Sequence, residues 1–335
     1  MVKVGIVGFG YWGNNLVRNF NNLPSCEVKY VCEKKPLNAK KCSSLYSNIN
    51  VVDDLNILIN DDEVDAVVIA TPVNSHYNLA KKALENNKNV LVEKPLTSSF
   101  KEAKELIELA NKKGKLLMVD HTFLYTGSVM HLKSLVEKNA MGDIQYFDST
   151  RINLGLFQHD VNVLWDLAPH DISICNHILN LKPISVQAVG ISHTKNNIEN
   201  IAYLTLKYEK NIIAHFNCSW VSPVKIRQML IGGSEKMVVF NDMEPTEKIK
   251  IYDTGYQYQT DEQRNDILVD YRTGDINVPK IKMTEALSLM AEDFINSIEN
   301  NTTPISNAQL GSDVVEILEA AETSIKKGGK EIKLN

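Results

Sequence analysis

The first part of the chain alternates short apolar runs with segments whose apolar residues recur at helical spacing. Lys3–Val7 is a short β-branched run, and Leu16, Val17 and Phe20 come after it at the spacing of one helix face. The next segments that resemble strands or helices are Val28–Cys32, Val64–Ile69, Leu79–Leu84, Asn89–Val92, Ser99–Lys112 and Lys115–Val119. Strands separated by helical patterns predict βαβ units and a parallel sheet that is covered on both faces.

The pattern changes after about residue 123. Helical segments are expected at Val129–Lys138 and Ile172–Leu181, and two amphipathic helices are expected at Thr284–Glu299 and Asn307–Lys327. The strand-like runs in this part are Ile144–Ile152, Ser185–Ser192, Ile201–Tyr208, Ile212–Trp220, Ile226–Gly232, Lys236–Phe240 and Lys248–Tyr252. Because these strands mostly succeed one another without helices, they favour a large, mostly antiparallel sheet. We therefore expect an α/β domain at residues 1–123 and an α+β domain at residues 124–335.

Composition excludes several classes of protein. The 335 residues carry a formal net charge of -5, so no basic excess is available for nucleic acid or for an anionic membrane surface. No apolar run approaches the ~20 residues that span a bilayer, and the first residues lack the pattern of a secretory signal. The five cysteines form no CxxC pair, which favours reduced thiols and a cytoplasmic protein.

A glycine-rich turn comes directly after the first expected strand. Gly8, Gly10 and Gly13 fit the GxGxxG pattern, with Tyr11 and Trp12 between the last two glycines, and a helix is expected directly afterwards. In this context the first glycine permits a tight turn, the second lets a pyrophosphate approach the backbone, and the third allows close packing of the helix. A turn that binds no ligand is the alternative. The pattern predicts a Rossmann domain that binds a dinucleotide.

The second expected strand ends at Glu33, about twenty residues after the last glycine, where an acid typically accepts hydrogen bonds from the adenosine ribose. A carboxylate there also repels a 2′-phosphate, so Glu33 favours NAD over NADP. Lys34 and Lys35 come next and weaken that preference. A solvated surface glutamate is the alternative interpretation.

Two further segments lie at the ends of expected strands, where open α/β sheets bind their ligands. They are the run from Ala70 to His76 and the triplet Glu93-Lys94-Pro95. Near a cationic nicotinamide ring and away from water, the pKa of a lysine falls, which suits proton transfer with an alcohol. A lysine that pairs with Glu93 is the structural alternative.

In the second part of the chain, Asp166 and His170 stand four residues apart, so a continuous helix would place them on one face. Pro169 favours the first turn of a helix, which makes Asp166 a plausible N-cap instead. A metal site is a third interpretation. We expect no metal, because a nicotinamide cofactor already supplies the chemistry. The candidate ligands of such a metal would be His159, Asp160, Asp166, His170 and Asp171.

Taken together, the segments GFGYWG, ATPVNSH, EKP and WDLAPHD resemble the Gfo/Idh/MocA oxidoreductases in kind, order and spacing. The resemblance covers essentially the whole chain and is carried by the ordered set of motifs. Relatives often have a glycine run ahead of the aspartate, where this chain has the residues from Val161 to Trp165. This departure puts the shape of the substrate pocket in doubt.

The resemblance implies roles for individual residues. Lys94 would bind the reacting hydroxyl and help to move its proton, His170 would act as acid and base, and Asp166 would orient the substrate. Residues implied to lie near the nicotinamide ring, its ribose or the diphosphate are Thr71, Pro72, Asn74, His76 and Glu93. The implied cofactor is NAD.

The WDLAPHD form looks most like members that oxidise a nucleotide-activated amino sugar, typically a UDP-linked N-acetyl sugar at C3, for polysaccharide or glycolipid synthesis. A free-sugar or inositol dehydrogenase and a non-catalytic NAD-binding sensor are the alternatives. Relatives commonly form dimers or tetramers through the antiparallel sheet, so we expect a homo-oligomer. A nucleotide diphosphate would need phosphate and stacking partners, although each candidate also suits an ordinary structural role. The candidates are Tyr125, Arg151, Phe157, Trp220, Lys225 and Arg227.

Overall fold

The structure is a computed structural model that describes residues 1–335 except 156, 159–160, 258–269 and 335. The chain forms two compact units. Unit 1 comprises Met1–Thr126 and Thr284–Glu316, and unit 2 comprises Gly127–Met283 and Ile317–Asn335. The two domains expected from the sequence, residues 1–123 and 124–335, stay a prediction.

Unit 1 is built on a six-stranded sheet in the order β3-β2-β1-β4-β5-β6, with all neighbours parallel. The strands are β1 Val2–Val7, β2 Cys26–Cys32, β3 Asn50–Val52, β4 Ala66–Ile69, β5 Asn89–Glu93 and β6 Leu117–Asp120. This is the Rossmann order, and the order of the strands reverses between β1 and β4. Every residue of β4 and β6 is buried, as expected for strands covered on both faces.

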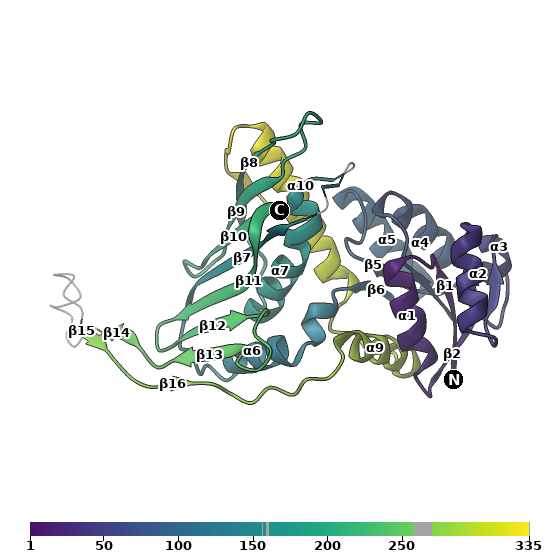
Figure 1. The fold of residues 1–335 in the computed structure, drawn as a ribbon, viewed down its shortest axis with the longest axis horizontal. Coiled ribbons are helices and arrows are strands. Elements are labelled where there is room, and N and C mark those ends of the chain that lie inside the picture. Colours follow the sequence, from purple (N-terminus) through teal and green to yellow (C-terminus); the bar gives the residue numbers. More distant parts are fainter. Residues whose placement is uncertain (156, 159–160, 258–269, 335) are drawn as a thin grey trace. The chain divides into compact units, whose positions relative to one another are not determined.

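The helices of unit 1 lie against this sheet (Figure 1). They are α1 Tyr11–Asn21, α2 Pro36–Leu45, α3 Leu55–Ile59, α4 His76–Glu85, α5 Phe100–Lys113 and α9 Ala286–Asn300, with 3₁₀ turns η1 Val73–Ser75 and η2 Thr122–Tyr125. Helix α9 joins this unit through specific contacts with α1. The rings of Phe20 and Phe294 meet edge to face, and Arg18 pairs with Glu285 just before α9. A late segment of the chain therefore completes the first unit.

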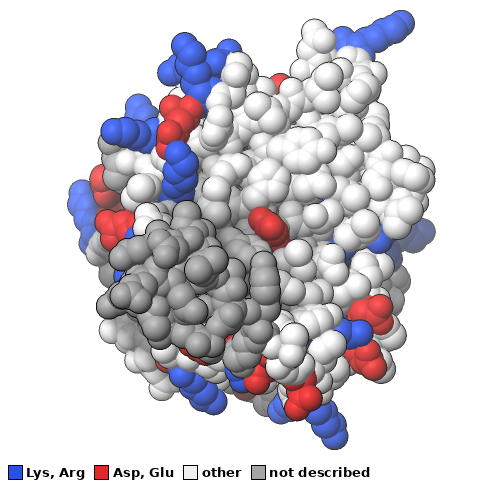
Figure 2. Space-filling model, turned by 90° about the vertical axis from the view of Figure 1, so that its left-hand side faces the viewer, with Lys and Arg blue, Asp and Glu red and all other residues white. Residues whose placement is uncertain are grey.

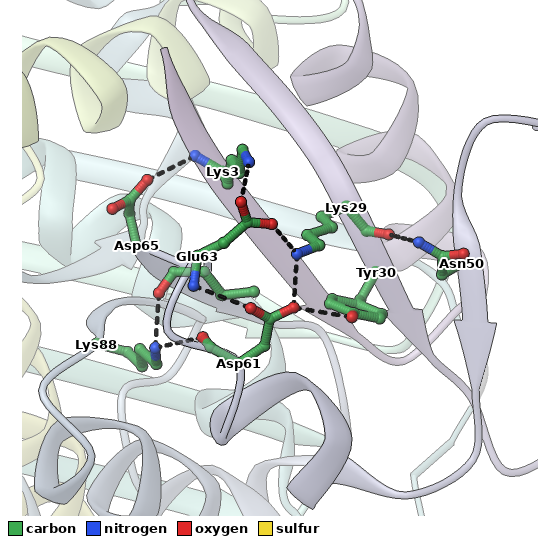
Figure 3. A network of polar contacts seen from close by, with 9 residues as sticks. Lys3, Lys29, Tyr30, Asn50, Asp61, Glu63, Asp65 and Lys88 are labelled. Atoms are coloured by element: carbon green, nitrogen blue, oxygen red, sulfur yellow. Dashed lines mark hydrogen bonds and ion pairs between the residues drawn. The ribbon is translucent and has the colours of Figure 1, made fainter.

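A polar network ties together the loop before β4 and the strands β1 and β2 (Figure 3). The Lys29 ammonium lies 2.6 Å from Asp61 and 2.5 Å from Glu63, and Glu63 also pairs with Lys3 at 3.1 Å. Tyr30 donates to Asp61 at 2.8 Å. Hydrogen bonds, first of all from Lys29, lower the pKa of Asp61 to about 2. These charges neutralise one another, so we assign this network a structural role.

Unit 2 is built on a nine-stranded sheet in the order β16-β13-β12-β11-β7-β10-β9-β8-β17. Its neighbours are antiparallel except for the parallel pair β7 and β10. The strands are β7 Ile144–Leu154, β8 Ser185–Ile191, β9 Ile201–Lys207, β10 Ile213–Ser219, β11 Val221–Gly233, β12 Met237–Asn241, β13 Ile249–Tyr252, β16 Ile276–Asn277 and β17 Ile332–Lys333. A separate hairpin pairs β14 Gly255–Gln257 with β15 Asp270–Arg272.

One face of this sheet packs against helices. Helix α7 Val163–Leu179 contacts β7, β9 and β10, and helix α6 Gly127–Glu137 packs on α7. Helix α10 Ala308–Lys326 contributes residues to both units, and its Ser324 bonds to Ala188 of β8. A buried ion pair joins sheet and helix, because Arg151 of β7 bonds to Asp171 of α7 at 2.5 and 2.9 Å.

The fold class expected from the sequence is confirmed. A parallel Rossmann sheet is followed by a large, mostly antiparallel sheet with helices. The expected boundaries of α7 are wrong at its beginning, since the helix starts at Val163 rather than at Ile172. Among the described residues, no helix is long and apolar enough to cross a bilayer.

Candidate active site

Close packing within the chain explains why two positions of the turn after β1 are glycine. Gly8 has a φ of 95°, and a Cβ there would overlap the carbonyl oxygen of Ala70, which comes directly after β4. A Cβ at Gly13 would overlap the carbonyl oxygen of Gly8. The two glycines therefore let α1 begin directly against the ends of β1 and β4.

Gly10 has no such explanation within the chain. Its φ of -76° suits any residue, and an added Cβ would find no atom within 4 Å. It is the N-cap of α1, without a side-chain cap and with no acidic residue in the first turn, so the first N–H groups remain open to an anion. A pyrophosphate approaching this backbone explains the glycine, and the turn therefore fits NAD. The adjacent Tyr11 and Trp12 are 79% and 49% exposed and meet edge to face.

Glu33 lies directly after β2 and is tied to the glycine turn. Its carboxylate accepts a hydrogen bond from the backbone N–H of Phe9 at 2.8 Å and another from Lys35 at 2.7 Å. Burial acts to raise the pKa of Glu33, but these backbone donors outweigh it and hold the pKa below its ordinary value. The group is therefore ionised at neutral pH and stands at the end of β2, where the adenosine ribose of NAD binds in this fold.

The segment after β4 contains Thr71, Pro72, Asn74 and His76. Pro72 precedes the turn η1, which includes Asn74, and the Thr71 hydroxyl lies 2.7 Å from that of Ser75. His76 is buried and points into the protein, with its ring nitrogens 2.9 Å from the carbonyl oxygen of Pro95 and 2.8 Å from that of Thr71. It thus connects the loop after β4 with the loop after β5. Cofactor contacts by these four residues stay predictions.

The ends of β5 and β6 bring together a cluster of ionisable groups. Glu93 and Asp120 are register partners on the neighbouring strands, and both are buried. Lys94 is the next residue after Glu93, is half-buried, and begins a cis peptide bond to Pro95. Burial and then the negative charge of Asp120 raise the pKa of Glu93 well above its ordinary range. The Lys94 charge opposes this rise and therefore stands close to the pair.

Asp120 and His121 were not predicted from the sequence. Burial raises the pKa of Asp120, against a hydrogen bond from the Thr122 hydroxyl. His121 is 1% exposed, and neither ring nitrogen has a hydrogen-bond partner. Burial, and after it the Lys94 charge, lowers the pKa of His121 to about 3. The signal was available, since polar residues directly after a buried strand at the carboxyl edge are candidates by the same rule that selected Lys94.

In unit 2, Asp166 and His170 lie one turn apart on α7. The N-cap of this helix is Asn162, whose side chain accepts from the N–H groups of Leu164 and Trp165, so the alternative that Asp166 is the N-cap is wrong. Pro169 is accommodated inside the helix. Most of α7 is buried, whereas Asp166 and His170 are both half-exposed. Asp166 accepts a hydrogen bond from the Trp220 indole at 2.9 Å, which fixes its carboxylate.

Several candidate nucleotide contacts are already engaged within the chain. Arg151 is buried in its pair with Asp171, and the Tyr125 hydroxyl donates to Asp293 at 2.6 Å. Trp220 is 2% exposed and stacks with Phe157 at 5.8 Å. Arg151, Tyr125 and Trp220 are therefore unsuited to phosphate binding or base stacking. Arg227 lies 3.5 Å from Asp242, and Lys225 is exposed on β11.

Metal binding finds no support in the described part of the chain, where no three His, Cys, Asp or Glu side chains form a group that could hold an ion. Two of the candidate ligands, His159 and Asp160, lie outside the described residues.

Comparison with known proteins identifies the family. Residues 2–121 match the oxidoreductase family model with the NAD-binding Rossmann fold of the Gfo/Idh/MocA group, and residues 129–239 match the C-terminal domain of the same group. The chain belongs to the Gfo/Idh/MocA family of NAD-binding oxidoreductases. The resemblance stated from the sequence motifs is thereby confirmed.

Individual relatives agree with this assignment. The chain is 25% identical to the uncharacterized oxidoreductase YdgJ of Escherichia coli, with 97% of this chain and 96% of that protein covered. Its fold is similar to the UDP-N-acetylglucosamine 3-dehydrogenase GnnA of Acidithiobacillus ferrooxidans, with a TM-score of 0.80, 20% identity and coverage of 97% and 98%. It is also similar to GenD2 from gentamicin A biosynthesis in complex with NAD, with a TM-score of 0.83, 20% identity and coverage of 100% and 96%.

Substitution by alanine should affect mainly NAD binding at Gly10 and mainly stability at Gly8. Gly10→Ala should cost less than about 1 kcal/mol of stability and weaken NAD binding by about tenfold or more, because the methyl group occupies space that only the ligand uses. Gly8→Ala should destabilise the fold by about 1–3 kcal/mol through its positive φ. Calorimetric NAD titration and urea unfolding measure both. Equal NAD affinity in Gly10→Ala and the wild type would contradict this interpretation.

Stability should fall in acid partly because His121 is buried as a neutral ring. The pKa of His121 in the folded protein lies below the ordinary value of about 6.5. The contribution of the neutral ring to the free energy of unfolding is therefore complete above pH ~6.5 and is lost as the pH falls towards the folded pKa. Between pH 7 and pH 5, the free energy of unfolding should fall by about 2 kcal/mol less in His121→Asn than in the wild type. Urea unfolding at both pH values tests this, with His193→Asn, an exposed position in unit 2, as the control. An unchanged loss in His121→Asn would refute the assignment.

Proposed function

We propose that the chain oxidises a ring hydroxyl of a sugar to a ketone with NAD, and that the substrate is a UDP-linked N-acetyl amino sugar oxidised at C3. The observation that carries this proposal is Lys94, a half-buried lysine at the carboxyl end of β5 in a Rossmann unit. The similarity of fold to GnnA supports the choice of a nucleotide sugar. The product would serve polysaccharide or glycolipid synthesis.

The proposed chemistry divides between three residues and a bound cofactor. NAD, when bound, accepts the hydride from the sugar carbon. Lys94 binds the hydroxyl, and its ammonium stabilises the developing ketone oxygen. The resemblance to the family implies that His170 takes part in exchanging the hydroxyl proton and that Asp166, which accepts a hydrogen bond from Trp220, orients the sugar. Holding the reactants at near-attack distance contributes roughly 7–11 kcal/mol of the lowering of the barrier.

We propose that NAD is preferred to NADP. The support is the carboxylate of Glu33, which two backbone N–H groups keep ionised at the end of β2. A negative charge at this place repels a 2′-phosphate and accepts hydrogen bonds from ribose hydroxyls.

Absorbance at the NADH wavelength tests the reaction, with NAD and NADP offered alongside UDP-linked N-acetyl sugars, free sugars and inositols. We expect a rise with a UDP-linked N-acetyl sugar and NAD. A rise only with free polyols would establish the free-sugar or inositol dehydrogenase instead. No rise with any substrate would favour the non-catalytic NAD-binding sensor.

Lys94→Ala should lower kcat by about 10²–10⁴-fold, because the group that exchanges the hydroxyl proton is removed. NAD affinity, measured by calorimetry, should change by no more than a few-fold. The matched control is Lys101→Ala, at an exposed position on α5, which should turn over normally. Unchanged turnover in Lys94→Ala would contradict the catalytic assignment.

We further propose that two copies of the chain associate through the open face of the nine-stranded sheet. The face that does not contact helices exposes large apolar side chains, namely Val189, Ile191, Tyr203 and Ile213, which are 43–56% exposed. Tyr203 also stacks on His215 of the next strand. Figure 2 looks onto the left-hand side of Figure 1, where this sheet is drawn, and shows a broad area with few charged side chains. A flat, neutral, apolar face of this kind favours a second copy as its partner.

Light scattering after size exclusion tests this association. The wild type should be a dimer or tetramer, and Ile213→Glu should shift it towards the monomer by placing a charge in the interface. Ile57→Glu on α3 is the control, because Ile57 is 48% exposed against 46% for Ile213. A monomeric wild type would refute the proposal.

A further inference from the structure

Two carboxyl side chains stand next to each other in the interior of unit 1. Glu93 ends β5 and Asp120 ends β6, and their Cα positions are paired in the register of these parallel strands. They are 9% and 4% exposed. Two adjacent buried carboxylates cannot both remain ionised at low cost, so one proton is retained between them.

The hydrogen bonds of the pair indicate where this proton lies. Oε2 of Glu93 accepts from the backbone N–H of Lys94 at 3.2 Å, and Oδ1 of Asp120 accepts from the Thr122 hydroxyl. Oε1 of Glu93 is buried and has no hydrogen-bond donor. A proton shared with the carboxyl of its register partner Asp120 would satisfy this oxygen. A hydrogen bond between the two side chains raises the pKa of Glu93 and opposes the rise in the pKa of Asp120, as expected if Glu93 holds the proton.

The charges around the pair make its proton sensitive to a bound cation. The Lys94 charge acts on Glu93, on Asp120 and on the neighbouring ring of His121. Tyr125 is a further titratable group on which Asp120 acts, and Asp293 holds its hydroxyl. With one proton, the pair carries a single negative charge, which the Lys94 charge stabilises. An additional positive charge at this edge favours loss of the proton.

We propose that Glu93 and Asp120 share one proton in the cofactor-free protein, release it when NAD⁺ binds, and then accept the proton that the sugar hydroxyl loses. This rests on the proposed function, because the nicotinamide must lie at the ends of β4 to β6. That position is expected from Glu33 at the end of β2, since the dinucleotide crosses the switch point between β1 and β4. Glu93 and Asp120 are positioning residues that act through Lys94.

The proton balance is complete. The Lys94 ammonium gives a proton to the doubly ionised pair, which returns to the singly protonated state. The resulting amine takes the proton of the sugar hydroxyl, and the alcohol carbon gives a hydride to the nicotinamide ring. The products are the ketone, the reduced cofactor and the pair with one proton, and the positive charge lost by the nicotinamide ring equals the charge regained by the pair.

Calorimetry in two buffers with different ionisation enthalpies counts the protons released on binding. Wild-type protein at neutral pH should release about one proton for each NAD⁺ bound and almost none for each NADH. Glu93→Gln and Asp120→Asn should each bind NAD⁺ with almost no release, since neither retains a pair to share a proton. Glu316→Gln is the matched control, because Glu316 is a buried glutamate of α10 with 7% exposure, and it should behave as the wild type.

Infrared difference spectra of the wild type give a second readout that needs no variant. The C=O band of a protonated carboxyl group should be present without cofactor, disappear with NAD⁺ and persist with NADH. Absence of the band in the cofactor-free protein, or its persistence with NAD⁺, would overturn the proposal. So would equal proton release in Glu93→Gln and the wild type.

These measurements separate the two proposals. Proton release and band loss without oxidation of any sugar would leave the shared proton established and refute the sugar dehydrogenase. Sugar oxidation without proton release on NAD⁺ binding would establish the sugar dehydrogenase and refute the shared proton. The pH profile of kcat adds a readout that a merely structural pair would not move. Its acidic limb, set by deprotonation of the pair in the NAD⁺ complex, should be lost in both variants.

Discussion

The close approach of α1 to the ends of β1 and β4 is the constraint on which the cofactor end of unit 1 depends. Gly13 can contact the carbonyl of Gly8, and Gly8 that of Ala70, only because neither glycine has a Cβ. This contact places the uncapped N-terminus of α1 beside the switch point of the sheet. It also aims the N–H of Phe9 at Glu33, so the phosphate and ribose ends of one ligand are positioned by a single turn.

The two units differ in how their buried ionisable side chains are paired. In unit 2, Arg151 and Asp171 neutralise each other, and the Ser149 hydroxyl donates to Asp171 at 2.7 Å, so the pair is well satisfied and joins sheet to helix. In unit 1, two acidic side chains sit side by side at the end of the sheet. The first arrangement costs desolvation but gains Coulomb energy and rigidity. The second adds repulsion between two acids to the cost of desolvation, so a role in chemistry explains it better than a role in folding.

Periodicity and glycine chemistry account for the features that the sequence predicted correctly. The alternation of strands and helices in unit 1, the run of strands in unit 2, the glycine turn and the location of Glu33 and Lys94 at strand ends all required only local pattern. The elements α2, β3 and α3, between Cys32 and Val64, were not predicted. The beginning of α7 was missed because Pro169 reads as a helix start, whereas the capping side chain of Asn162 and the burial of the first turn decide the boundary. Asp120 and His121 were missed for a different reason. Their position at the end of a buried strand was a usable local signal, but the pairing of Asp120 with Glu93 depends on β5 and β6 being neighbours in register, which no local pattern contains.

Lys94 links these observations, because its charge acts on four other ionisable groups. It opposes the raised pKa values of Glu93 and Asp120, and it adds to burial in lowering those of His76 and His121. Removing the ammonium should therefore shift the pKa values of all four groups. His76 carries the effect further, since its ring nitrogens face the carbonyl oxygens of Thr71 and Pro95. A neutral ring donates to only one of the two, so the protonation state of His76 governs how firmly the loops after β4 and β5 are joined.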